Sequence, residues 1–118
     1  MKPLLEIEIP GVPPSVNHYW MSNGKRRYLS AKALSFIKLV VGRIQPQNSV
    51  ARLSIDLEFC FPDRRVRDLD NFLKGTLDSL VKAGLCEDDS QFDRISVSRG
   101  EVIKGGLTRV RVNELIEG

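Results

Sequence analysis

Two aspartates and a lysine lie close together in the stretch RDLDNFLKGTLDSL, which covers residues 67–80. In an extended segment, side chains two residues apart point to the same side, so Asp68 and Asp70 can face one way. Asp70 and Lys74 are one helical turn apart and can share a face of a helix, and Asn71 belongs to the same polar side. We therefore expect these four side chains to converge at one exposed helix N-terminus.

A second acidic group, Glu87, Asp88 and Asp89, follows the helix that this stretch predicts. If the next strand runs beside the strand that ends at residue 59, this loop returns to the same end of the sheet as Asp68. At least three carboxylates would then meet. Oxygen-only clusters of this kind suit a hard cation such as Mg²⁺ or Mn²⁺, and the metal would relieve the repulsion between the carboxylates.

Each of these features also has a purely structural explanation. Asp70 can be a helix N-cap, Lys74 and Asp78 can form a surface ion pair, and the segment EDDS can be a polar turn. The combination favours metal-dependent phosphate chemistry, because a basic cluster that suits phosphate binding lies directly upstream; its members are Arg64, Arg65 and Arg67.

The composition is that of a soluble globular protein, with 118 residues, 42% hydrophobic and 28% charged. The length predicts a single domain over residues 1–118. No apolar run approaches a membrane span and no secretory signal is visible, so we expect a cytoplasmic protein. Cys60 and Cys86 are isolated and His18 is the only histidine, which argues against zinc. The net charge of +3 is compatible with a polyanionic partner.

The elements that must position the site residues are predicted from periodicity and turn signals. Alternation predicts strands over residues 5–9, 53–59, 94–103 and 107–113. Helical periodicity predicts helices over residues 31–44, capped by Ser30, and over residues 70–83, stopped by Gly84. Asn23-Gly24 predicts a hairpin over residues 19–29 with a type I′ turn. The order predicts an α+β fold in which a small mixed or antiparallel sheet packs against two helices.

The first predicted helix is apolar on more than one side. Leu34, Ile37, Val41 and Ile44 form one apolar stripe, and Phe36, Leu39 and Val40 widen it beyond a single core-facing side. A helix that is apolar on most sides is either central or packed on a partner chain. We therefore expect Phe36, Leu39 and Val40 to pack across a two-fold interface.

Residues 62–91, PDRRVRDLDNFLKGTLDSLVKAGLCEDDSQ, resemble the core of the RusA family of Holliday-junction resolvases. The shared pattern is D-x-D-N-x-x-K, a short helix, K-A-G and then a D-D pair. The segment PPSVNHYW at residues 13–20 also resembles the family's proline-rich entry followed by Asn. This sequence departs from the pattern by placing Glu87 beside the D-D pair, so whether Glu87 or Asp88 also binds metal stays open.

The resemblance implies an intertwined two-fold homodimer that hydrolyses DNA with Mg²⁺, for which Mn²⁺ can substitute. Such an enzyme cuts the two opposed strands of a four-way junction symmetrically, in DNA recombination and repair. Carried over by position, the catalytic residues are Asp68, Asp70, Lys74 and Asp89, and the three aspartates are the metal ligands. We interpret four further residues as DNA-binding: Arg64, Arg65, Arg67 and Asn71.

Two other functions remain open. The chain can be a non-catalytic DNA-binding module, or a nuclease for flaps, other branched DNA or ordinary duplex. The clustered carboxylates argue against pure binding, because binding to a polyanion gains nothing from them. Selectivity for a junction depends on the shape of a dimer, which a sequence does not show.

Overall fold

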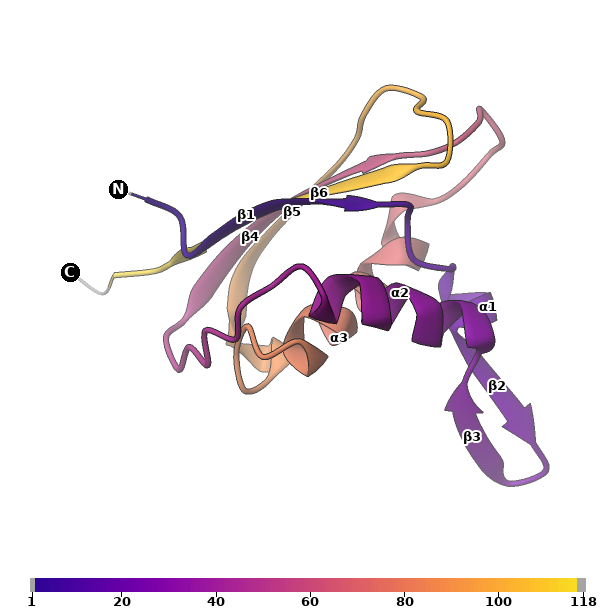
Figure 1. Ribbon diagram of the computed structural model, residues 1–118, viewed down its shortest axis with the longest axis horizontal. Coiled ribbons are helices and arrows are strands. Elements are labelled where there is room, and N and C mark those ends of the chain that lie inside the picture. The colour runs from indigo at the N-terminus through magenta and orange to yellow at the C-terminus, as the bar shows by residue number, and fades with distance from the viewer. Residues whose placement is uncertain (1, 117–118) are drawn as a thin grey trace.

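The structure, a computed structural model, describes residues 2–116 (Figure 1). Its strands are β1 (Leu5–Pro10), β2 (Trp20–Asn23), β3 (Arg26–Leu29), β4 (Leu53–Cys60), β5 (Phe92–Arg99) and β6 (Leu107–Glu114). Its helices are α1 (Val16–Tyr19), α2 (Ala31–Val41) and α3 (Leu73–Lys82), with 3₁₀ turns η1 (Leu69–Phe72) and η2 (Asp89–Gln91). None of the helices in the described residues is long and apolar enough to cross a membrane.

Four strands form one mixed sheet in the order β1-β6-β4-β5. β6 is antiparallel to both β1 and β4, whereas β5 is parallel to β4. β5 and β6 follow each other in the chain but do not pair, because β4 lies between them. Helices α2 and α3 lie on one face of this sheet (Figure 1). The predicted α+β fold with a mixed sheet and two main helices is therefore confirmed, with the short α1 added.

The core lies between the sheet and the two helices. In β4 the side chains of Leu53, Ile55 and Leu57 point toward the helices and are buried, as the alternation predicts. Asp56 points to the other face and is exposed. That other face, which we call the open sheet face, is lined by charged and polar side chains of all four strands, as expected for a sheet with one solvated side.

The apolar residues of helix α2 that are buried in the core differ from those that the prediction placed there. Ser30 caps the helix as predicted, since its Oγ accepts a backbone N–H of the first turn at 3.1 Å. Phe36 and Val40 are buried in the protein's own core, so the prediction that they pack across a dimer interface is wrong. They face the sheet because they continue the stripe of Ala33. Leu39 is 42% exposed and remains available to a partner chain.

Strands β2 and β3 form a separate hairpin that projects from the body of the protein (Figure 1). Its turn consists of Gly24 and Lys25, because Asn23 pairs with Arg26. Of these residues only Gly24 has a positive φ, +64°, as the first central residue of a type II′ turn does. The hairpin is therefore confirmed, but the type I′ turn centred on Asn23 and Gly24 is wrong.

The predicted helix over residues 70–83 forms in two parts, the 3₁₀ turn η1 and then α3. Gly84 follows with φ +88°, which confirms it as the residue that ends the helix. β5 covers Phe92–Arg99 instead of residues 94–103, and α2 ends at Val41 instead of residue 44.

Candidate active site

The loop between β4 and η1 carries the three arginines that the sequence singles out; we call residues 62–67 the arginine loop. Asp63 fixes its shape, since its carboxylate accepts hydrogen bonds from the Arg67 guanidinium at 2.8 Å and the Arg65 backbone N–H at 3.0 Å. The bond from Arg67 holds the pKa of Asp63 below its ordinary value. Arg64 and Arg65 remain exposed. Arg64 and Arg65 thus present their guanidiniums to solvent, whereas the Arg67 guanidinium stabilises the shape of the loop.

Arg99 belongs to the same region and was missed by the sequence reasoning. The parallel register places Arg99 opposite Phe59, near the end of β4 from which the arginine loop starts. Its guanidinium donates to the Arg67 carbonyl oxygen at 2.6 Å and lies 5.1 Å from the centroid of the Phe61 ring. Arg67 lies 4.9 Å from the same ring. Only the pairing of β4 with β5 could have revealed this residue, and a sequence does not state that pairing.

Asp68 and Asp70 lie at the start of η1, directly after the arginine loop. Both are exposed, and neither carboxylate has a hydrogen bond or ion pair among residues 2–116. Asp68 and Asn71 line a hollow of about 290 Å³ together with Arg67 and Ser15. The structure therefore places two carboxylates without a partner among residues 2–116 next to the arginine loop in the chain, and their predicted convergence with Lys74 stays a prediction.

Lys74 and Asp89 form an ion pair, with 2.6 Å between Nζ and Oδ2. This hydrogen bond raises the pKa of Lys74, so its ammonium stays charged at neutral pH. Lys74 belongs to the first turn of α3 and Asp89 opens η2. Lys74, at the start of α3, and Asp89, in the loop after it, are thus in direct contact.

Gln91 holds the acidic loop that carries Asp89. Its side chain is buried, and its Oε1 accepts the backbone N–H groups of Glu87 and Asp88 at 2.9 and 3.0 Å. Its Nε2 donates to the carbonyl oxygens of residues 49 and 51, both at 2.9 Å. The Asp88 carboxylate accepts the Ser90 backbone N–H at 3.0 Å and so caps η2. Asp88 therefore has a structural role that Asp89 lacks.

The expectation that the acidic loop and Asp68 lie at the same end of the sheet is wrong. β5 is parallel to β4, so the loop before β5 lies where β4 begins, whereas the arginine loop leaves from the other end of β4. Within residues 2–116, no three carboxylate, histidine or cysteine side chains lie close enough together to hold a metal ion. The donor chemistry fits a hard cation, because Asp68 and Asp70 offer unpaired oxygens, but the three-carboxylate site stays a prediction.

Helix α3 makes a close contact at Gly75, the residue after Lys74. A Cβ atom there would lie 2.9 Å from two ring atoms of Tyr19, which is too short for any other residue type without a shift. The Tyr19 hydroxyl donates to the Asp78 carboxylate at 2.9 Å. Burial raises the pKa of Tyr19 to about 12, so the hydroxyl keeps its proton. Gly75 thus allows the base of the hairpin to dock on the helix that carries Lys74.

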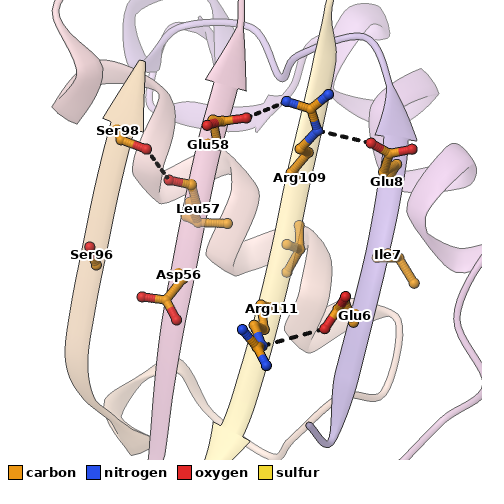
Figure 2. Close-up of a pocket in the computed structure, with 11 residues that line it drawn as sticks. Glu6, Ile7, Glu8, Asp56, Leu57, Glu58, Ser96, Ser98, Arg109 and Arg111 are labelled. Carbon is orange, nitrogen blue, oxygen red and sulfur yellow. Dashed lines mark hydrogen bonds and ion pairs between the residues drawn. The ribbon is translucent and has the colours of Figure 1, made fainter. Parts of the chain in front are cut away.

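A second collection of charges lies on the open sheet face, around a hollow of about 690 Å³ (Figure 2). Arg109 of β6 lies between Glu8 of β1 and Glu58 of β4 and contacts both carboxylates. Arg111, two residues along the same strand, pairs with Glu6 at 3.4 Å. These contacts join neighbouring strands in register and describe a ladder of ion pairs rather than a set of free ligands.

Comparisons with known proteins connect this geometry to one family. A family model described as endodeoxyribonuclease RusA matches residues 10–113. The crossover junction endodeoxyribonuclease rusA of Enterobacteria phage HK97 is 44% identical over 107 residues, which cover 87% of this chain and 89% of the phage protein. Proteins of the same name from Enterobacteria phage 82 and Escherichia coli K12 are 34% and 33% identical with the same coverage. The chain therefore belongs to the RusA endodeoxyribonuclease family.

Proposed function

We propose that this protein is an endodeoxyribonuclease that resolves four-way DNA junctions by symmetric hydrolysis of two opposed strands, in DNA recombination and repair. The observation that carries the proposal is the pair of free carboxylates, Asp68 and Asp70, directly beside a loop of exposed arginines. The names of the relatives, which are crossover junction endodeoxyribonucleases, support the same reaction and substrate.

The free carboxylates favour an enzyme over a non-catalytic binding module. A carboxylate next to a phosphate-binding loop repels DNA, so it weakens binding unless a cation is present. Arg64 and Arg65 are exposed and would contact phosphates on either side of the cut, together with Asn71 beside Asp68. Arg67 is held by Asp63, so its contribution would be to orient the loop as well as to bind.

We propose Mg²⁺ as the cofactor, replaceable by Mn²⁺, with Asp68, Asp70 and Asp89 as its ligands. When bound, such an ion neutralises charge on the scissile phosphate and lowers the pKa of a water molecule. The three carboxylates do not meet within the described residues, so this ligand set would require the acidic loop to shift toward Asp68 and Asp70 and Asp89 to leave its ion pair with Lys74. The released Lys74 ammonium would then be free to donate to a phosphate oxygen and stabilise the charge of the transition state.

We also propose that the active form is a two-fold homodimer. Two identical sites related by symmetry can cut two strands that are themselves related by symmetry. Three apolar side chains of α2 remain 42–49% exposed and offer surface for a second copy; they are Leu34, Leu39 and Val41. Substitution of Leu39 by aspartate should therefore reduce the mass measured by light scattering to that of a monomer.

The direct test is cleavage of a labelled four-way junction in Mg²⁺. We expect paired nicks at symmetric positions in opposed strands, while linear duplex of the same sequence stays intact. Equal cutting of flaps or linear duplex would support a general nuclease instead. Junction binding without any cleavage, in Mg²⁺ or Mn²⁺, would support the binding module and refute the proposal.

A further inference from the structure

Charge is distributed unevenly along this chain. Residues 9–55 contain seven of the eighteen lysines and arginines and none of the fifteen acidic residues. This acid-free segment forms α1, the hairpin β2–β3 and α2. Three of its seven cations follow one another at the tip of the hairpin and along β3: Lys25, Arg26 and Arg27.

The cations at the hairpin tip have no acidic partner. Lys25 and Arg26 are exposed and form no ion pair with any carboxylate of residues 2–116. Arg27 lies 4.5 Å from the centroid of the Trp20 ring, a cation–π contact that leaves its charge unneutralised. Because no acid lies nearby in the chain or across the hairpin, the tip carries an uncompensated positive potential.

One face of the hairpin combines that charge with apolar surface. Met21 pairs with Tyr28 across the two strands and Asn23 pairs with Arg26, so all four side chains share a face. Met21 is 46% exposed and Tyr28 is 45% exposed. An aromatic ring next to an unpaired guanidinium suits a nucleic acid, since the ring contacts a sugar or base and the cation contacts a phosphate.

The base of the hairpin is fixed to helix α3. Tyr19, which directly precedes β2, is 1% exposed and donates its hydroxyl hydrogen bond to Asp78 of α3. Its carbonyl oxygen accepts the Ser30 backbone N–H at 2.9 Å, which closes the hairpin. Gly75 of α3 provides the space for the Tyr19 ring. The hairpin therefore projects in a set direction from the helix that carries Lys74.

We propose that the hairpin β2–β3 is a second DNA-binding element, which contacts duplex DNA of the substrate outside the cleavage site through Lys25, Arg26 and Tyr28. The proposal rests on the proposed function, because that function supplies branched DNA as the ligand. The opposite surface supports the assignment: the open sheet face carries four carboxylates against two guanidiniums and disfavours DNA, so we place the substrate on the side of the helices and the hairpin.

The test measures junction affinity by fluorescence anisotropy in Ca²⁺, over a series of NaCl concentrations, for wild type and for Lys25→Ala/Arg26→Ala. We expect the double variant to bind at least about tenfold more weakly, with a salt slope smaller by about 2, because each phosphate contact contributes about 0.9 to the slope. Tyr28→Ala should weaken binding without changing the slope, since its ring carries no charge. Single-turnover cleavage at saturating protein in Mg²⁺ should be unchanged in both variants.

The matched control is Lys2→Ala/Arg94→Ala, which removes the same charge from two exposed positions on or before strands of the sheet. It should bind like wild type. A hairpin variant with the affinity and salt slope of this control would overturn the proposal. So would a hairpin variant that becomes monomeric by light scattering, because the hairpin would then contact a second copy of the chain.

The same assays separate this proposal from the proposed function. A wild-type protein that neither binds nor cuts the junction refutes the proposed function. A wild-type protein that cuts the junction, while the hairpin variant binds as the control does, refutes the hairpin proposal alone.

Discussion

Carboxylates gather in two regions of this protein, and the two regions differ in what surrounds them. On the open sheet face, Glu8 and Glu58 lie on the strands that flank Arg109, and both contact its guanidinium (Figure 2). At the start of η1, Asp68 and Asp70 contact no cation among residues 2–116. The first arrangement pairs its carboxylates with a guanidinium and joins strands, whereas the second leaves its carboxylates unpaired among the described residues.

The difference shows that neither charge density nor hollow size identifies the site. The open sheet face has a hollow of about 690 Å³ and the one beside Asp68 only about 290 Å³. In the larger hollow Glu6, Glu8 and Glu58 are already paired with arginines. Asp68 and Asp70 are exposed and pair with no cation among residues 2–116, so their oxygens are free to bind a ligand.

The largest effect is expected from removing the unpaired carboxylates. Asp68→Asn and Asp70→Asn should each lower single-turnover cleavage of a junction by about a thousandfold or more, because each removes a charged ligand of the proposed metal ion with little change in shape. Junction binding should persist or tighten, since a negative charge near the phosphates is gone. Asp56→Asn on the open sheet face is the control and should cut normally. Near wild-type cleavage by Asp68→Asn would show that Asp68 takes no part in the reaction.

A smaller loss is expected from Lys74, whose partner Asp89 is one of the proposed metal ligands. Lys74→Ala should lower the single-turnover rate by roughly two orders of magnitude with little change in affinity. Lys74→Arg should restore only part of the rate, because a planar guanidinium cannot replace a compact ammonium.

Lys82→Ala is the control for Lys74, since Lys82 lies on the same helix and pairs with Asp78 at 3.8 Å. It should leave the cleavage rate unchanged. If Lys74→Ala binds tenfold more weakly yet cuts normally once saturated, Lys74 positions DNA and has no catalytic role.

The open sheet face is held by ion pairs, whereas helix α3 is held against the base of the hairpin by close packing at Gly75. A substitution at Gly75 tests how much that packing stabilises the protein. Gly75→Ala places a Cβ atom 2.9 Å from the Tyr19 ring, so the free energy of unfolding should fall by about 1–3 kcal/mol. Chemical denaturation followed by Trp20 fluorescence measures this loss. Gly42→Ala has no contact shorter than 3.4 Å and should be nearly neutral. Equal stability of the two variants would mean that the contact at Gly75 relaxes freely.

The smallest effect is expected on the open sheet face. Arg109→Met should lower the melting temperature slightly, and more at low salt than at high salt, because exposed ion pairs are screened. Cleavage of the junction should stay at the wild-type level. A large loss of cleavage with intact folding would show that the open sheet face takes part in the reaction.

The parts of the fold that sequence could predict are those whose signals lie in neighbouring residues. The alternation around Ile55, the cap at Ser30 and the helix stop at Gly84 all formed as expected. The parallel pairing of β4 with β5 depends on contacts between distant segments. For that reason the position of Arg99 and the separation of the acidic loop from Asp68 could not be predicted.

The site itself was predicted in part for the same reason. Spacing within one segment predicted that Asp68 and Asp70 face the same way, and the structure shows that both are exposed. The contact between Lys74 and Asp89 joins the first turn of α3 to the loop that follows the helix. No sequence periodicity predicts such a contact. The metal and the dimer stay predictions, because both depend on components outside a single chain.

The parallel pairing of β4 with β5 also determines when the protein becomes a nuclease as it folds. Parallel strands can pair only after the whole crossover through α3 has closed, whereas the hairpin β2–β3 needs only its two-residue turn. Hairpins form within microseconds, and long-range pairing is slower. Lys74 and Asp89 both lie within that crossover, so we expect their ion pair to form late. A folding chain should therefore acquire its basic DNA-contacting hairpin before it can cut DNA.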